Sequence, residues 1–168
     1  MGMMGAGKTT VGRQLAKRLG KSFCDSDREI EARTGVRVAV IFDIEGEAGF
    51  RKREAEAIEQ LTALDDIVLA TGGGAVLDPR NREVLKARGF AIYLHAQPLV
   101  LCQRTRSDKS RPLLQGGDAL DRLEKLYAER DPLYRDVADL VVDTGRQSVS
   151  SLLALVLAKF DEACKLSA

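Results

Sequence analysis

The first residues of the chain form a pattern of glycines, a lysine and a threonine that can bind phosphate. Residues 2–9 read G-M-M-G-A-G-K-T and match the spacing G-x-x-x-x-G-K-[ST] in full. Glycines let the backbone turn its N–H groups toward phosphate oxygens, and the N-terminus of a following helix adds partial positive charge. Lys8 would then reach the outer phosphates, and Thr9 would ligate Mg²⁺. The pattern predicts a nucleoside triphosphate site with Mg²⁺; the alternative is a glycine-rich turn that Lys and Thr follow by chance.

Two carboxylates, Asp25 and Asp27, directly follow a short apolar segment and precede a helical one. In an open parallel sheet, residues at the carboxyl end of a strand face the ligand crevice. One carboxylate could hold the metal ion while the other orients an acceptor hydroxyl and takes its proton. The alternative is structural, because residues 26–29, S-D-R-E, also fit a capping box at a helix N-terminus.

A third helical segment carries Arg51, and three glycines, Gly72, Gly73 and Gly74, follow another apolar run. Bare backbone at the end of a strand lets a small ligand approach its amide groups. A guanidinium group can make paired hydrogen bonds to a carboxylate, which a lysine cannot. Arg51 could instead be an ordinary solvated residue, as we expect for most of the rest of the charged run 51–59, and the glycines could be a flexible turn.

Two further arginines lie downstream. Residues 107–118 are polar and contain Pro112 and two glycines, so we predict a mobile loop or lid over about 105–118, with Arg111 on it. An arginine on a mobile loop can neutralise the charge of a phosphoryl-transfer transition state when the loop closes. Arg130 precedes the sequence D-P-L-Y and is a second candidate for binding a carboxylate.

Short apolar strands that alternate with helices must position these side chains. Runs rich in β-formers predict strands at residues 22–24, 67–70, 90–94 and 140–142. Apolar periodicity and end signals predict helices at residues 9–19, 27–33, 45–64, 78–88, 98–106, 119–135 and 148–165. Nearly all-apolar strands separated by helices are typical of a parallel sheet that helices cover on both faces, so we predict an α/β fold.

The composition restricts the function further. The 168 residues fit one domain, and 26 Lys+Arg against 25 Asp+Glu lack the basic surplus typical of proteins that bind nucleic acid or anionic membranes. The longest apolar run, residues 152–158, is much shorter than the roughly 18 residues that cross a bilayer. The first residues do not form a secretory signal, so we expect a cytoplasmic protein. We also expect a monomer whose three cysteines are reduced.

Taken in their order along the chain, these motifs resemble those of the shikimate kinase family. The resemblance spans nearly the whole chain and includes the phosphate loop 5–10, Asp25 and Asp27, Phe50-Arg51, the three glycines, the sequence R-P-L-L at 111–114, and Arg130 before P-L-Y. It implies the three-layer P-loop nucleoside monophosphate kinase-like fold, with a parallel sheet of strand order 2-3-1-4-5. It also implies transfer of the γ-phosphoryl group of ATP to the 3-hydroxyl of shikimate, a step toward chorismate and the aromatic amino acids.

The resemblance implies a role for each candidate residue within one domain, 1–168. Asp27 resembles the residue that binds the substrate hydroxyls and serves as the base, and Lys8 and the lid arginine Arg111 would be catalytic as well. With a substrate-binding segment at about 27–55, shikimate would contact Asp27, Arg51, Gly72, Gly73, Gly74 and Arg130, the arginines holding its carboxylate. ATP would be bound by Gly5, Ala6, Gly7, Lys8, Thr9, Thr10, Arg104, Arg111 and Gln147. Mg²⁺ would be held by Thr9 and Asp25.

Two other functions stay open at this point. Another small-metabolite kinase of the same fold, acting on gluconate or a nucleoside monophosphate, would share the phosphate loop, but the glycine triplet and Phe50-Arg51 argue against it. A nucleotide-binding protein without catalytic activity is the second alternative. The intact set of catalytic candidates argues against this one.

The start of the sequence conflicts with the fold that the resemblance implies. In this family the first strand precedes the phosphate loop and lies in the middle of the sheet, but only Met1 precedes Gly2 here. The four predicted strands would then be numbers two to five, with a gap at the central position. We expect that the chain starts upstream or is a fragment, and that the chain as written has reduced stability and weak ATP binding.

Overall fold

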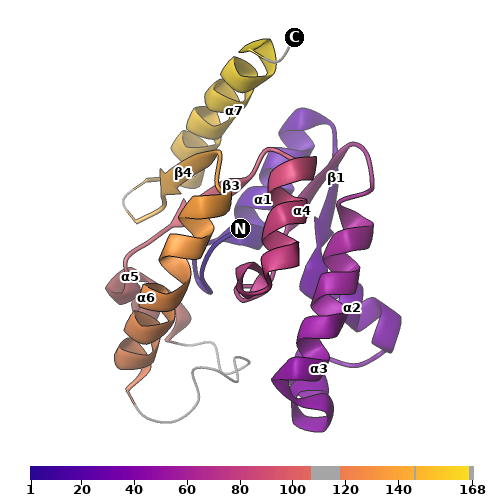
Figure 1. The fold of residues 1–168 in the computed structure, drawn as a ribbon. Coiled ribbons are helices and arrows are strands. Elements are labelled where there is room, and N and C mark those ends of the chain that lie inside the picture. Colours follow the sequence, from indigo (N-terminus) through magenta and orange to yellow (C-terminus); the bar gives the residue numbers. More distant parts are fainter. Residues whose placement is uncertain (107–117, 146, 167–168) are drawn as a thin grey trace.

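Helices and short strands alternate along the chain (Figure 1). The computed structural model describes residues 1–106, 118–145 and 147–166. In chain order the elements are α1 (Lys8–Leu19), β1 (Ser22–Asp25), α2 (Ser26–Thr34), α3 (Val38–Leu61), β2 (Ile67–Ala70), the 3-10 turn η1 (Ala75–Leu77), α4 (Pro79–Arg88), β3 (Ile92–His95), α5 (Pro98–Thr105), α6 (Ala119–Val137), β4 (Leu140–Asp143) and α7 (Val149–Leu166). Every strand and helix predicted from the sequence has its counterpart among them.

The longest helix, α3, differs most from its prediction. It begins at Val38 instead of residue 45, because Ile41 packs with Ile30 and Phe50 in a small second core between α2 and α3. At Gly46 the backbone leaves the helical region, with φ of 70°, so the helix is kinked next to the predicted start. The apolar residues before the kink are too few to show a helical period by themselves, which is why the prediction missed this part.

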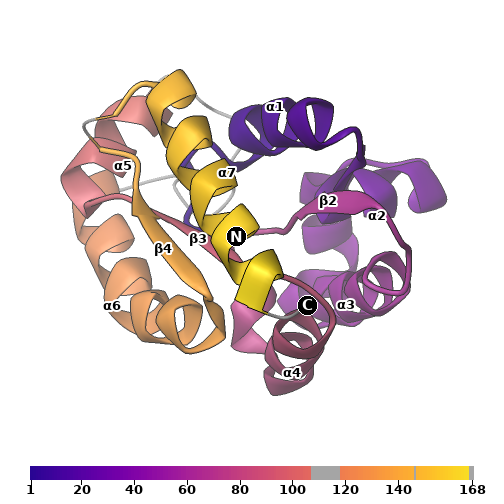
Figure 2. The same ribbon diagram turned by 90° about the horizontal axis from the view of Figure 1, so that it is seen from above.

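The strands form two separate parallel pairs. β1 pairs with β2, with Ser22 opposite Ile67, and β3 pairs with β4, with Ile92 opposite Leu140. The described strands therefore do not form the one continuous sheet of order 2-3-1-4-5 that the resemblance implies. They form two pairs that lie on either side of the N-terminus (Figure 2).

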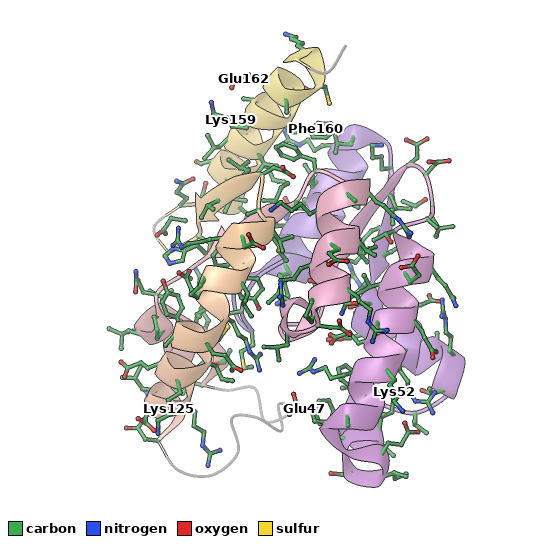
Figure 3. The ribbon with its side chains drawn as sticks, viewed as in Figure 1. Glu47, Lys52, Lys125, Lys159, Phe160 and Glu162 are labelled. Carbon is green, nitrogen blue, oxygen red and sulfur yellow. The ribbon has the colours of Figure 1, made fainter. Side chains whose placement is uncertain are left out.

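A cavity of about 390 Å³ separates the two pairs. Residues of β2, β3, α1 and α7 line it, and Figure 3 shows Phe160 on the side of α7 that faces α1 and α4. Met1 lines the cavity too: its amino group donates to Ile92 O at 2.8 Å, and its carbonyl oxygen accepts from Leu94 N at 2.9 Å. This is the hydrogen-bond pattern of a residue in a strand parallel to β3.

Helices cover the strands on two sides (Figure 2). α1 packs on β1 and β2 and contacts α7, which packs on β4; on the other side α4 contacts both α3 and α6. The main core joins these elements, and its fully buried side chains include Tyr93, Leu101, Leu123, Tyr134 and Leu153. The fold is therefore α/β. None of the helices in the described ranges combines the length and the apolar character needed to span a bilayer, and the three cysteines are free.

Candidate active site

The glycine-rich loop 2–7 leads directly into the N-terminus of α1. Gly7 caps this helix in the left-handed region, with φ of 90°, a conformation that favours glycine. Met3 and Ala6 are buried members of the main core, and they anchor the loop. Lys8 folds back over the loop, where its Nζ donates to Met3 O at 3.0 Å. Loop and helix N-terminus thus have the arrangement that suits phosphate, with the candidates Gly5, Ala6, Gly7, Lys8, Thr9 and Thr10 side by side.

Asp25 links the phosphate loop helix to the start of α2. Its Oδ2 accepts a hydrogen bond from the Thr9 hydroxyl at 3.2 Å, and its Oδ1 accepts from Asp27 N at 3.2 Å. Asp25 is therefore the N-cap of α2, and the capping box that the sequence S-D-R-E suggests is not formed. Ser26 is buried instead, and its Oγ accepts from Gly72 N at 3.0 Å, which ties this corner to the glycine turn.

Asp27 is half-buried and faces the glycine turn. Its Oδ1 is buried and has no hydrogen-bond partner among the described residues. Burial raises the pKa of this carboxyl above its usual value, and the negative charge of Asp25 raises it further, whereas Lys8 and Arg51 act in the opposite direction. A carboxyl with a raised pKa beside a cationic phosphate loop suits a proton acceptor in phosphoryl transfer.

Two glutamates on α3 hold Arg51. Its Nη1 donates to Glu54 Oε2 at 2.6 Å, and its Nη2 donates to Glu47 Oε1 at 2.8 Å. Glu54 is 0% exposed; burial raises its pKa, and the charge of Arg51 opposes the shift. The Arg51 guanidinium lies against Gly74, where any Cβ would collide with it. Figure 3 shows Glu47 on the side of α3 that faces α6 and Lys52 on the other side, so one face of this charged helix is turned toward the site.

The glycine turn between β2 and η1 lets charged groups approach its backbone. A Cβ at Gly72 would lie 2.5 Å from Glu54 Oε1 and 2.8 Å from Asp27 Oδ1. Because glycine has no side chain, these two carboxyl groups can converge there. On α6, Arg130 Nη1 donates to Gly73 O at 3.2 Å.

Arg130 is 3% exposed. Its Nε lies 3.9 Å from Glu129 Oε2, too far for a hydrogen bond, and has no hydrogen-bond partner in the described part of the chain. A buried N–H without an acceptor is costly, so a donor in this state is suited to a ligand that brings an acceptor. Arg51 from α3 and Arg130 from α6 thus flank the glycine turn. Two guanidinium groups on either side of bare backbone suit a small acceptor with a carboxylate.

Arg104 connects the phosphate loop to the segment after β4. Its Nη1 donates to Thr144 Oγ1 at 3.1 Å and lies 3.4 Å from Gly5 O, and its Nη2 donates to Thr144 O at 2.6 Å. Gln147 is exposed just before α7, and no hydrogen bond within the described residues joins it to this group. Arg111 lies outside the described residues, as does most of the predicted lid at 105–118.

Three residues of this site, Ser26, Glu54 and Tyr134, were not among the candidates. Most of the charged run after Arg51 was expected to be solvated, and Glu54 is an exception: it lies one helical turn from Arg51 and is fully buried. That spacing was a signal in the sequence. Tyr134 follows Arg130 by one helical turn and belongs to the quoted sequence D-P-L-Y, but no role was assigned to it. Ser26 gave no such signal, because the fold brings it to a glycine that lies 46 positions away.

The fold and the site together are those of a P-loop kinase that phosphorylates a small molecule. Its phosphate loop, half-buried carboxyl and flanking arginines are the parts that such a reaction needs. The sequence model of the family described as "SKI: Shikimate kinase" matches residues 4–161. The chain belongs to the shikimate kinase family, and it is an enzyme of the shikimate pathway.

Individual relatives agree with this assignment. The chain is 60% identical over 161 residues to the shikimate kinase of Thiobacillus denitrificans, covering 96% of this chain and 88% of the relative. A solved shikimate kinase from Acinetobacter baumannii, in complex with shikimate, is 47% identical with a TM-score of 0.93 over 96% of this chain and 90% of that one. The Aquifex aeolicus shikimate kinase is 32% identical with a TM-score of 0.85, covering 98% and 95%.

A gluconokinase from Sinorhizobium meliloti has a TM-score of 0.58 over 100% of this chain and 94% of that one. Its sequence is only 16% identical, so the likeness extends to the fold alone.

Proposed function

We propose that the chain transfers the γ-phosphoryl group of ATP to the 3-hydroxyl of shikimate, with Asp27 as the base. The observation that carries this proposal is the position of the Asp27 carboxyl. Asp27 Oδ1 lies against Gly72 of the glycine turn, and the positive charges of Lys8, at the end of the phosphate loop, and of Arg51 oppose the rise that burial and Asp25 cause in its pKa. The carboxyl therefore lies between the nucleotide side and the acceptor side of the site. Its Oδ1 has no hydrogen-bond partner in the described ranges and is available to an acceptor hydroxyl.

The nucleotide would lie over the phosphate loop. The backbone N–H groups of residues 5–10 and the positive end of α1 would bind its phosphates, and Lys8 would move from Met3 O to the outer phosphate oxygens. Arg104, which already lies near the loop and the segment after β4, is the candidate for the nucleotide base together with Gln147.

The acceptor would lie against the glycine turn 72–74. Arg51 and Arg130 would hold its carboxylate, and Asp27 would accept a hydrogen bond from its hydroxyl group. Asp27 and Arg51 fall within the proposed substrate-binding segment, 27–55, which contains most of α3 and all of α2 except Ser26.

Mg²⁺ fits the oxygen atoms of Thr9 and Asp25, which lie 3.2 Å apart. This ion prefers hard oxygen ligands, retains several waters and is usually bound together with substrate phosphates. Among the described residues there is no cluster of three or more His, Cys, Asp or Glu side chains, which is compatible with a metal that the nucleotide helps to hold. When bound, the ion would neutralise charge on the phosphates.

In the reaction, Asp27 would take the proton of the 3-hydroxyl group while the oxygen of that hydroxyl group attacks the γ-phosphorus. The new oxygen–phosphorus bond forms while the bond to the bridging oxygen breaks, and ADP keeps that electron pair. Lys8 and the loop N–H groups would stabilise the transferring group. Asp27 must be ionised to act, and because its pKa is raised, we expect activity to fall on acidification at a higher pH than for an ordinary aspartate.

The lid that the sequence predicts over about 105–118, most of which lies outside the described residues, would complete the proposed site within a single monomeric domain, 1–168. Arg111 would be carried to the phosphates when the lid closes, where its charge would stabilise the transition state. The polar sequence around Arg111 and the charge of its guanidinium group support this role.

We also propose that the two strand pairs are halves of one parallel sheet, in which a central strand would lie between β2 and β3. If that central strand is counted as the first, the order is 2-3-1-4-5. The cavity between β2 and β3 would be the central position, and the ladder bonds that Met1 makes to β3 support this arrangement. An extended strand in the cavity would hydrogen-bond to both pairs and would support the phosphate loop, which begins at Gly2.

A panel of acceptors tests the proposed function against its alternatives. ADP formation would be measured with Mg²⁺, ATP and, in turn, shikimate, gluconate or a nucleoside monophosphate. We expect turnover with shikimate alone. Transfer to gluconate or to the nucleotide without transfer to shikimate would favour another small-metabolite kinase, and ATP binding without any turnover would favour a nucleotide-binding module.

A further inference from the structure

Helix α6 holds the glycine turn through two donors that are one helical turn apart. Arg130 Nη1 and the Tyr134 hydroxyl both donate to Gly73 O. The bond from Arg130 measures 3.2 Å, at the long end for an N–H donor, and the bond from Tyr134 is the shorter of the two. One carbonyl group of the turn is therefore fixed by two side chains of the same helix.

The ring of Tyr134 is itself held in place by packing. It is fully buried and stacks on Tyr93 of β3, with ring centroids 4.7 Å apart and an angle of 22° between the planes. Burial raises the pKa of the Tyr134 phenol well above its usual value, so the hydroxyl keeps the proton that it donates.

Gly73 lies between the acceptor side and the nucleotide side of the site. A Cβ on it would lie 3.6 Å from Met4 N in the phosphate loop and 3.9 Å from Arg130 Nη1. Because the peptide unit is planar, fixing the Gly73 carbonyl also fixes the direction of the Gly74 N–H. The orientation of this N–H and the position of the Arg130 guanidinium both depend on how that carbonyl is held.

We propose that Tyr134 is a positioning residue for the acceptor: its hydroxyl holds the Gly73 carbonyl so that Arg130 and the turn amides present fixed donors to the acceptor carboxylate. This inference rests on the acceptor site proposed above. Without the hydroxyl, the carbonyl would depend on Arg130 for its side-chain hydrogen bond in the described part of the chain. Arg130 would then be drawn toward the carbonyl, and the turn would gain freedom that acceptor binding must remove.

Two phenylalanine variants test this role, because the two stacked tyrosines form a matched pair. Tyr134→Phe removes the bond to Gly73 O. Tyr93→Phe also removes one hydroxyl from a buried ring, but that hydroxyl donates to Asp131 Oδ1 at 2.9 Å, and Asp131 keeps its ion pair with Arg135. Each variant loses one hydrogen bond from a buried tyrosine, but only Tyr134→Phe loses a bond to the glycine turn.

Calorimetric titration would give the dissociation constants of shikimate and of ATP separately. For Tyr134→Phe we expect shikimate binding to weaken roughly 3- to 10-fold, the worth of one hydrogen bond, with ATP binding within about twofold of wild type. For Tyr93→Phe we expect both constants within about twofold. Incorporation of 4-aminophenylalanine at position 134, which restores a neutral donor on the same ring, should return shikimate affinity to near the wild-type value.

The outcomes separate this role from the function on which it rests. A wild-type protein that binds no shikimate would overturn the proposed function and, with it, the role of Tyr134. Equal weakening of shikimate binding in the two phenylalanine variants, or equal weakening of shikimate and ATP in Tyr134→Phe, would overturn the positioning role alone. If Tyr134→Phe does not fold, the aminophenylalanine variant still decides: we expect shikimate affinity near wild type, and a tenfold loss would contradict the proposal.

Discussion

Asp27 Oδ1 and Glu54 Oε1 converge on the α-carbon of Gly72, where a Cβ would lie 2.8 Å from the first and 2.5 Å from the second. Both oxygens are buried and have no hydrogen-bond partner among the described residues. Burial raises the pKa of both carboxyls, and the charge of Asp27 adds to the shift at Glu54. This corner of the molecule therefore presents hydrogen-bond acceptors that have no donors among the described residues. The hydroxyl groups of a polyhydroxylated substrate would supply those donors.

The role of Asp27 as base predicts a large loss of turnover in Asp27→Asn. An amide cannot take the proton of the acceptor hydroxyl, so we expect kcat to fall by on the order of 10²–10⁴. Steady-state kinetics at saturating ATP and shikimate would measure kcat for the wild type and for the variant.

Asp43→Asn is the matched control for this substitution. Asp43 is an exposed carboxylate within the same segment, 27–55, and its loss should leave kcat unchanged. Turnover of Asp27→Asn within a few-fold of the control would mean that Asp27 is not the base.

The same Asp27→Asn variant should be more stable than wild type at neutral pH. Because the pKa of Asp27 is raised in the folded protein, wild type loses stability as pH rises from the ordinary aspartate range, about 3.9, through the raised value. The amide avoids this loss, so we expect a melting temperature on the order of 2–4 °C higher at pH 7, for a cost of about 1 kcal/mol. The difference should vanish below about pH 4; a variant less stable than wild type at pH 7 would contradict the burial of an unpartnered carboxylate.

The arginine pair predicts a split between the two substrates in Arg51→Lys. Lysine keeps the positive charge but cannot form the paired hydrogen bonds of a guanidinium group, so KM for shikimate should rise about tenfold or more while KM for ATP changes less than twofold. Arg53→Lys serves as control, because Arg53 lies on the same helix and pairs with Glu45 at the molecule's surface. Equal losses for shikimate and ATP in Arg51→Lys would argue against binding of the carboxylate.

The cavity between β2 and β3 predicts that an added strand will stabilise the protein. Six apolar β-forming residues joined before Met1 could continue its ladder bonds to β3 and reach β2. We expect a clear rise in melting temperature and tighter ATP binding relative to the chain as written. Six Gly and Ser residues at the same place are the control; if both additions behave alike, the cavity is not the central position of a sheet.

The sequence predicted structure well where the interacting residues are close together along the chain, and less well where they are far apart. The phosphate loop and the helix after it are contiguous in sequence, so their pattern was sufficient to predict both. Arg51 was found as a candidate, but its partner Glu54 was assigned to a solvated face, although a position three residues away on a helix is a neighbour. Strand ends were predicted to within two residues, whereas the pairing of Ser26 with Gly72 depends on the tertiary fold.

The arrangement of the strands was predicted only in part. The resemblance implied a gap at the centre of a five-stranded sheet, and the structure has two parallel pairs with a cavity between them. Composition and periodicity cannot locate such a gap, because they describe each strand but not its neighbours. The lid arginine, Arg111, falls outside the described residues and stays a prediction from sequence.

The most direct test of the account is ADP formation by the wild-type protein with Mg²⁺ and ATP, measured with and without shikimate. We expect ADP release to depend on shikimate and the phosphorylated product to carry its phosphate on the 3-oxygen, as phosphorus–proton NMR coupling would show. ADP release that is the same without shikimate, or a phosphate on another oxygen, would contradict the proposed placement of the acceptor hydroxyl at Asp27.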